Sequence, residues 1–255
     1  NFKAWELYQR GLNSLYLMNK ESLNEAADHF LDSIEIDNNF GQAYSYLAFT
    51  ISHFVFLGFS KNSEGDIKKA KFYVEKALDC DNRDSLAHEM LARIYSLSKN
   101  HDQAVEAAKK AIECNVNSSS AYMFYASALT FANRCEEALE PIDQAIKLSP
   151  RDPRTFNFLM NKAMIVGEMG DLKLSVDLAR KAVAIPQGDF RPALILAIYC
   201  AKSGLLDEAQ KAIERVLKII PNFTLTKLKE NFFSHFETKL LDSYILNLSK
   251  LDVPK

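Results

Sequence analysis

Residues 119–150 read SSAYMFYASALTFANRCEEALEPIDQAIKLSP, and the architecture of the chain can be worked out from this segment. Its first half is apolar and aromatic. Its second half places small residues, Ala138 and Ala145, among acidic and basic ones. Small residues seven positions apart lie on one face of a helix, where they let a second helix approach closely. The segment therefore predicts two antiparallel helices, the second of which ends at Pro150.

The same pair of small residues, seven positions apart, recurs along the whole chain. The pairs are Ala26/Ser33, Ala70/Ala77, Ala104/Ala111, Ala138/Ala145, Ser175/Ala182 and Ala209/Val216. Successive first members are 44, 34, 34, 37 and 34 residues apart, and such a period indicates stacked helical repeats. Because one helix pair cannot bury its apolar face alone, we predict an all-α array of about six helix hairpins.

A period of 34 residues with paired helices resembles the tetratricopeptide repeat (TPR). The third and sixth repeats carry most of that pattern, and the fourth carries it at Tyr122, Tyr125, Ala126, Leu129, Ala138, Ile142, Ala145 and Pro150. The resemblance covers about residues 4–221. It implies a right-handed α-solenoid in which the first helix of each hairpin lines a concave groove.

The repeat boundaries follow from the pattern and from the stops after each second helix. We expect repeats at about residues 4–38, 41–82, 85–116, 119–150, 156–187 and 190–221, followed by C-terminal capping helices at 222–255. Leucines recur at helical spacing in that tail, and terminal repeats need a cover for their apolar face. The second repeat has about ten extra residues around Phe59–Lys69, and we predict a loop there because Ser60–Asp66 has loop composition.

The two ends of the chain carry a narrower resemblance. The start matches it at Ala4, Glu6, Leu7, Tyr8, Gly11, Glu21, Ser22, Leu23 and Ala26. Together with the aromatic and leucine-rich tail after Pro221, it resembles the TPR regions of bacterial class III adenylate/guanylate cyclases and of winged-helix transcriptional regulators. This resemblance implies a bacterial signalling or regulatory module. Neither a cyclase domain nor a winged helix fits within the 255 residues, so such an activity would lie outside this chain.

Composition argues against several other classes of function. A net charge of −2 is unlike the basic stripe of a nucleic-acid binder or the polybasic patch of a membrane-surface protein. The 4 cysteines form no C-x-x-C pair and predict reduced thiols in a cytoplasmic protein. No catalytic, metal-binding or phosphate-binding motif stands out, so we expect no enzyme activity, no metal and no cofactor.

The concave groove is the expected partner-binding surface. By the TPR resemblance, positions 2, 5, 9, 12 and 13 of each repeat point into it, and Trp5 and Tyr16 are among these positions. We predict that the partner contacts Tyr8, Leu12, Phe49, His53, Glu89, Arg93, Met123, Phe131, Met160, Met164, Leu194 and Ile198. Such an apolar, aromatic and methionine-rich groove suits a partner helix, an extended peptide or a linked effector domain.

Two alternatives stay open at this stage. Each groove residue could instead pack against the tail or a neighbouring turn of the same chain. The array could also serve as a structural scaffold or oligomerisation unit, and the sequence leaves the oligomeric state undecided. A carboxylate clamp like that of the co-chaperone TPR domains is not expected, because Tyr8, Ser45 and Phe49 stand where its Lys, Asn and Arg side chains would be.

Overall fold

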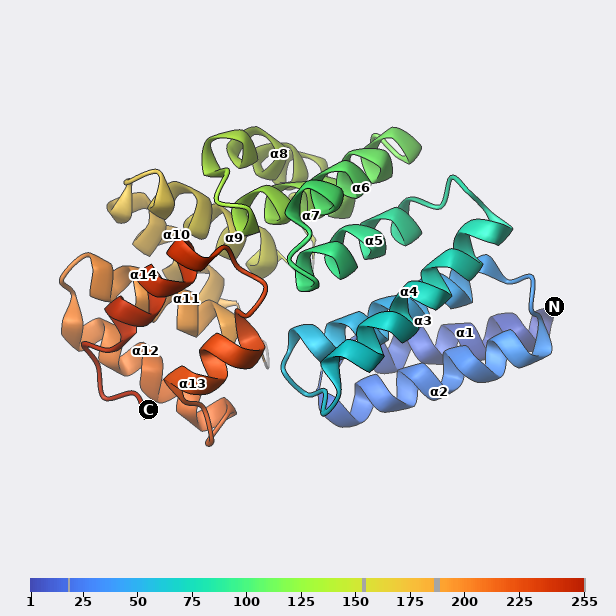
Figure 1. Cartoon of the computed structure of the whole chain (residues 1–255), viewed down its shortest axis with the longest axis horizontal. Coiled ribbons are helices and arrows are strands. Elements are labelled where there is room, and N and C mark those ends of the chain that lie inside the picture. The colour runs from blue at the N-terminus through green and yellow to red at the C-terminus, as the bar shows by residue number, and fades with distance from the viewer. Residues whose placement is uncertain (18, 153–154, 186–188, 255) are drawn as a thin grey trace. The chain divides into compact units, whose positions relative to one another are not determined.

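Antiparallel helix pairs make up most of the chain in the computed structural model (Figure 1). The structure describes residues 1–17, 19–152, 155–185 and 189–254. Within those residues there are fourteen α-helices, one π-helical turn and no β-strand. The predicted all-α array of consecutive helix hairpins is confirmed. Gln187, the predicted end of the fifth repeat, and Lys255, the end of the predicted cap, lie outside the described residues.

The contacts divide the chain into two compact units, Asn1–Val116 and Asn117–Lys255, which we call unit 1 and unit 2. The hairpins of unit 1 are α1 (Phe2–Leu15) with α2 (Lys20–Ile36), α3 (Gly41–Phe56) with α4 (Ser63–Cys80), and α5 (Ser85–Leu97) with α6 (His101–Cys114). The repeat spacing does not predict a division after the third repeat.

Unit 2 contains three further hairpins and the C-terminal segment. The hairpins are α7 (Ser119–Phe131) with α8 (Cys135–Leu148), α9 (Thr155–Glu168) with α10 (Leu172–Ala184), and α11 (Arg191–Lys202) with α12 (Leu206–Ile219). The C-terminal segment, Asn222–Pro254, holds α13 (Leu225–Lys227), the π-helical turn η1 (Leu228–Phe232) and α14 (Thr238–Leu248).

Small residues lie where the two helices of a hairpin cross. Ala104 and Ala111 on α6 are fully buried, as are Ala138 and Ala145 on α8. A side chain of one carbon lets the backbones approach, and the larger apolar residues of the first helix fill the space around the crossing. The 34-residue alanine period is therefore the spacing of these crossings along the chain.

Two glycines within helices allow the same close approach between elements as the small residues at the crossings. A Cβ atom on Gly11 would lie 2.6 Å from a ring carbon of Phe30, and one on Gly167 would lie 2.3 Å from a ring carbon of Tyr199. Both rings occupy the space that any other residue would need for its side chain. Gly167 thus lets the Tyr199 ring of α11 lie directly against α9.

The predicted loop in the second repeat is wrong over part of its length. Helix α4 already begins at Ser63, inside the expected loop of Ser60–Asp66. The Asn62 side chain caps it by accepting the Gly65 N–H at 3.1 Å, and acidic residues occupy its first turn. Asn at the N-cap and acidic residues in the first turn both stabilise a helix start, so these polar residues lengthen α4.

Candidate partner-binding surface

The first helices of the first two hairpins in unit 1, α1 and α3, carry a chain of neighbouring aromatic rings. We call the side of unit 1 that bears the predicted groove positions its inner face. The ring centroids of Tyr8 on α1 and Tyr46 on α3 are 5.6 Å apart, and Tyr46 lies 6.4 Å from Phe49. Phe49 then stacks on His53 at 5.3 Å, and His53 stacks on Phe56 at 6.0 Å. We call these five residues the aromatic ladder.

Arg93 of α5 completes the ladder from the next hairpin. Its guanidinium carbon lies 4.9 Å from the Phe49 ring centre and 5.4 Å from that of Phe56, both within cation–π range. Its Nη1 is 2.9 Å from Nδ1 of His53. Because a guanidinium only donates hydrogen bonds, Nδ1 accepts here, and the neutral imidazole then carries its proton on Nε2. The structure therefore brings together Phe49, His53 and Arg93, three of the predicted groove residues.

The ladder is packed tightly at its α1 end. Burial, together with the neighbouring Tyr46 and Asp84, raises the pKa of Tyr8 far above its usual value, so the phenol stays neutral.

Asp84 is the N-cap of α5, where it accepts hydrogen bonds from the backbone N–H groups of Leu86 and Ala87. The Ser45 hydroxyl of α3 donates to the other oxygen of the same carboxylate. These bonds fix α5 against α3 and so fix the position of Arg93.

Helix α1 and its C-cap residue Tyr16 also present an exposed stripe at the same repeat positions. Trp5 is 49% exposed and Tyr16 is 72% exposed, with the half-buried Leu12 between them. Leu12 and Tyr16 lie in the first repeat where Phe49 and His53 lie in the second. Aromatic side chains offer a large contact area with few torsions to fix, which makes them frequent anchors at protein interfaces.

The predicted groove residues of unit 2 are largely internal in this structure. Met123 is half-buried, whereas the others are buried: Phe131 on α7, Met160 and Met164 on α9, and Leu194 and Ile198 on α11. Glu89 of unit 1 is buried as well. A partner could reach fully buried residues only after other parts of the chain moved away. The prediction that these side chains bind a partner stays untested.

The C-terminal segment is one reason for this burial. Phe236 stacks on Phe131 at 4.7 Å, and the Glu237 N–H donates to the Phe131 carbonyl at 2.9 Å. Further along, the hydroxyls of Tyr244 and Tyr199 are 2.7 Å apart. Sequence reasoning gave these tail residues only a capping role. Their pairing with α7 and α11 leaves no local signal, although the aromatic cluster NFFSHF shows that the tail has several large rings to bury.

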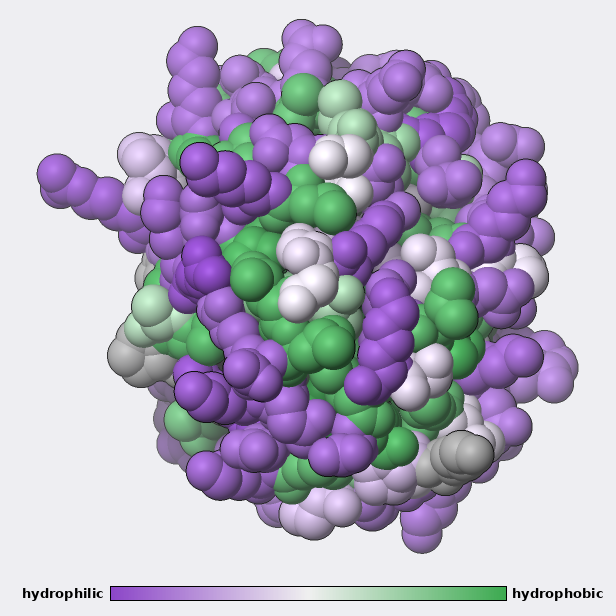
Figure 2. Space-filling view, turned by 90° about the vertical axis from the view of Figure 1, so that its left-hand side faces the viewer, coloured by the Kyte–Doolittle hydropathy of each residue, from purple (hydrophilic) through white to green (hydrophobic). Residues whose placement is uncertain are grey.

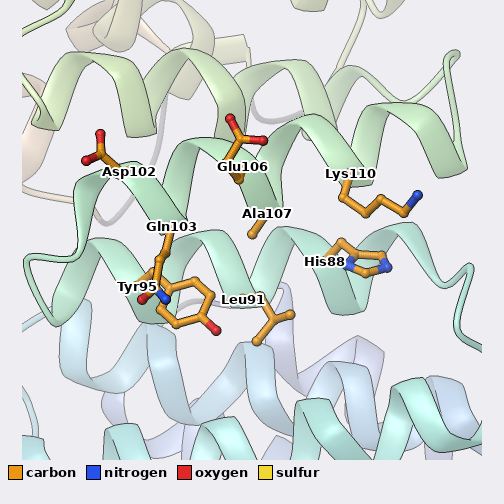
Figure 3. A pocket seen from close by; sticks show the side chains of 8 residues that line it. All are labelled: His88, Leu91, Tyr95, Asp102, Gln103, Glu106, Ala107 and Lys110. Carbon is orange, nitrogen blue, oxygen red and sulfur yellow. The ribbon is translucent and has the colours of Figure 1, made fainter.

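A shallow groove of about 410 Å³ lies beside hairpin α5–α6 (Figure 3). It is lined by His88, Leu91, Tyr95, Asp102, Gln103, Glu106, Ala107 and Lys110. His88 and Lys110 lie at one end and Asp102 at the other (Figure 3). Glu106 and Lys110 pair along α6 with Lys109 and Glu113, at 3.0 and 2.8 Å. These residues form an ordinary charged helix surface around an apolar floor, without a paired nucleophile and base.

Two features are absent from the part of the chain that the structure describes. In those residues, no group of three or more His, Cys, Asp or Glu side chains is placed to hold a metal ion. No helix among them has both the length and the apolar character needed to cross a bilayer.

Comparison with known proteins agrees with the hairpin architecture. The tetratricopeptide repeat family profile matches residues 87–115. The chain is similar to the solved structure of PilW, described as a widely conserved type IV pilus biogenesis factor, with 19% identity and a TM-score of 0.60 over 82% of this chain and 92% of that one. A search of curated protein sequences found no match.

Two other solved structures share the fold. PilF of Pseudomonas aeruginosa has 19% identity and a TM-score of 0.58, covering 84% of this chain and 92% of that one. The Cut9–Hcn1 hetero-tetramer of the APC/C has 14% identity and a TM-score of 0.68, covering 96% of this chain and 46% of that one. At such identities the similarity shows the fold alone.

The chain thus has a TPR-like solenoid fold, and one segment of it, residues 87–115, matches the TPR family profile. Proteins built this way generally serve as scaffolds for protein–protein interaction and are typically non-catalytic. Because one fold hosts many functions, the particular role has to be argued from the surface.

Proposed function

We propose that this chain is a non-catalytic protein-interaction module that binds a partner peptide or helix on the inner face of unit 1. The observation that carries the proposal is the aromatic ladder held by Arg93, together with the exposed stripe of Trp5, Leu12 and Tyr16 along α1 and its C-cap. Interfaces concentrate their binding energy in a few aromatic and arginine residues placed on rigid elements. Unit 1 has both the aromatic and arginine residues and the packed helices that hold them.

The ladder and the stripe would act differently in binding. The exposed rings of Trp5 and Tyr16 would lose water on contact with an apolar side chain of the partner, which favours association. The buried rings of Phe49 and His53 would keep the surface rigid, so that little conformational entropy is lost on binding. The partner would bind along α1 and α3, with an apolar residue over the stripe.

The finer part of the proposal concerns context. We propose that the module regulates a linked or separate effector in a bacterial signalling or transcription-regulating protein of the cytoplasm. This part is supported by the resemblance of the two chain ends to the TPR regions of cyclases and winged-helix regulators, and by the absence of paired cysteines in the sequence. Binding would favour one arrangement of the effector through its differential affinity for the two arrangements.

The test is a selection of binding peptides from a random display library, with the full chain as target. The affinity of the selected peptides is then measured for a Trp5→Ser/Tyr16→Ser variant. Both side chains are exposed, so this variant should keep the helicity of the parent. The matched control is Phe72→Ser, which removes a ring of 52% exposure from α4.

We expect the selected peptides to bind the double variant at least about tenfold more weakly, because one interface anchor contributes 1.4 kcal/mol or more. The control should bind like the parent. Peptides that respond only to Phe72→Ser, or a selection that yields no binder, would contradict the proposal.

Self-association is a second candidate function, and one observation favours it. Apolar side chains gather across the middle of the unit 2 face seen in Figure 2, with hydrophilic ones around them. In the sequence of unit 2, large apolar residues that are exposed include Met169, Leu174, Leu205, Leu206 and Leu246. Exposed apolar clusters often mark contact surfaces. Light scattering over a concentration series tests this, and a monomer at every concentration would eliminate it.

A further inference from the structure

We propose that the C-terminal segment is a built-in ligand of unit 2, and that the first helices α7, α9 and α11 form a binding surface for a helix with the same aromatic pattern. This inference rests on the proposed function, because it extends binding on the first helices of the hairpins from unit 1 to unit 2. The occupant of the unit 2 surface is the C-terminal segment, residues 222–254 of the same chain.

The segment buries its side chains as a bound helix would. Its buried apolar residues are Phe223, Leu228, Phe232, Phe233, Phe236, Leu240, Leu241, Tyr244, Leu248 and Val253. Leucine and tyrosine at positions 240, 241, 244 and 248 share one side of α14, at the i, i+4 and i+8 spacing of a helix that lies in a groove. The opposite side carries Leu246, which is 65% exposed.

The first anchor lies at the end of α7. Phe236 stacks on Phe131, and the His235 ring meets the same phenylalanine edge-on at 4.7 Å. The last carbonyls of a helix have no partner within that helix. Phe131 is the last residue of α7, and its carbonyl accepts the Glu237 N–H of the segment at 2.9 Å. The surface thus binds both an aromatic side chain and a backbone N–H of its ligand.

The second anchor joins α9, α11 and α14 through a buried polar network. The hydroxyls of Tyr199 and Tyr244 are 2.7 Å apart, and the Tyr199 hydroxyl donates to Glu168 at 2.9 Å. Lys202 donates to the same carboxylate oxygen at 3.0 Å. The Tyr199 hydroxyl has one proton, which goes to Glu168 or to the Met164 carbonyl at 3.1 Å, and Tyr244 then donates its own proton to Tyr199. The surface therefore presents an acceptor at a fixed place for a tyrosine of its ligand.

The segment differs from a seventh repeat. It forms no hairpin with α12, and it lacks the pair of small residues that marks each crossing. It starts with the three-residue α13 and the π-helical turn η1, and then α14 packs on α11. Every residue of α11 from Arg191 to Ala201 is buried. The segment thus begins irregularly and then covers the regular first helices of the hairpins. This is how a ligand is arranged on a binding surface.

Tethering explains why this site stays filled. A ligand joined to its site by a short connection has an effective concentration in the millimolar range. A free helix of the same pattern therefore competes poorly with the resident segment. It would bind once the anchors of that segment are weakened.

The test uses the full chain with both anchors trimmed, Phe236→Ser/Tyr244→Ser. The probe is a synthetic peptide of residues 228–248, LKENFFSHFETKLLDSYILNL. The control is the same peptide with the same two substitutions. We expect the variant to bind the probe at least about thirtyfold more tightly than the wild-type chain does, and more tightly than it binds the control peptide, because buried aromatic anchors dominate such interfaces.

A variant that keeps its helicity and does not bind the probe would overturn the proposal, since the segment would then be a fixed part of the core. Hydrogen exchange on the wild-type chain covers the case in which the variant unfolds. Amides of α14 should exchange before those of α9 and α11, and exchange of all three in one event would overturn the proposal. Neither readout depends on a partner of unit 1, so failure of the proposed function would be seen separately.

Discussion

The network of Tyr199, Tyr244 and Glu168 makes an unequal pair of substitutions informative. Tyr244→Phe removes a hydroxyl whose partner, Tyr199, still has Glu168 and the Met164 carbonyl as acceptors. We expect a cost of about 1 kcal/mol in the free energy of unfolding, the typical value for one hydrogen bond. Tyr199→Phe takes a donor from a carboxylate and also leaves the buried Tyr244 hydroxyl without its acceptor. That loss should cost about 2–3 kcal/mol.

The double variant decides whether the two hydroxyls act together. In the Tyr199→Phe background the Tyr244 hydroxyl has lost its acceptor, so removing it should cost nothing or even stabilise the chain. The double variant should therefore lose about 1 kcal/mol less than the sum of the single losses. Urea unfolding followed by circular dichroism measures the free energy of unfolding of all four proteins. The slope of that free energy against urea concentration should be the same in each. Equal single costs that add without coupling would refute this reasoning.

Further predictions concern packing and titration. Gly167→Ala should lower the free energy of unfolding by about 1 kcal/mol in urea, because overpacking against the fixed Tyr199 ring outweighs the gain in helix propensity; equal or greater stability would contradict the packing described. Burial raises the pKa of Cys135 from 9.0 to about 11 and that of Cys200 to about 12. Above pH 9 the unfolded chain therefore loses thiol protons that the folded chain keeps, and stability should fall by up to about 1.4 kcal/mol per pH unit and thiol, as urea midpoints would show. At neutral pH a thiol reagent should label the exposed Cys80 first and should reach Cys135 and Cys200 only on unfolding, which mass spectrometry resolves.

The sequence predicts the hairpins well because their spacing depends on local chemistry. Ala104, Ala111, Ala138 and Ala145 mark crossings that only small residues allow, so a count along the chain locates them. The start of α4 was missed for an equally local reason. Ser, Glu, Gly and Asp are typical of loops, but behind Asn62 they are also typical of a capped helix start.

Other features depend on contacts between distant residues. The stacking of Phe236 on Phe131 joins positions more than a hundred residues apart, and neither residue carries a sign of the other. The sequence therefore offers burial of the groove residues on α9 and α11 only as an alternative. In unit 1, Tyr46 and Phe56 belong to the aromatic ladder although they fall outside the predicted groove positions. Tyr46 lies about one helical turn before Phe49, and Phe56 about one turn after His53. These positions, together with their aromatic rings, are the signal in the sequence for their place in the ladder.

The most direct measurement for the central claim is a hydrogen-exchange footprint of a selected peptide on the full chain. We predict that the peptide slows exchange in α1 and α3, the helices that carry the exposed stripe and the ladder, and leaves α2, α4 and α6 unchanged. Protection confined to α2, α4 or α6 would contradict the claim that the inner face of unit 1 binds the partner.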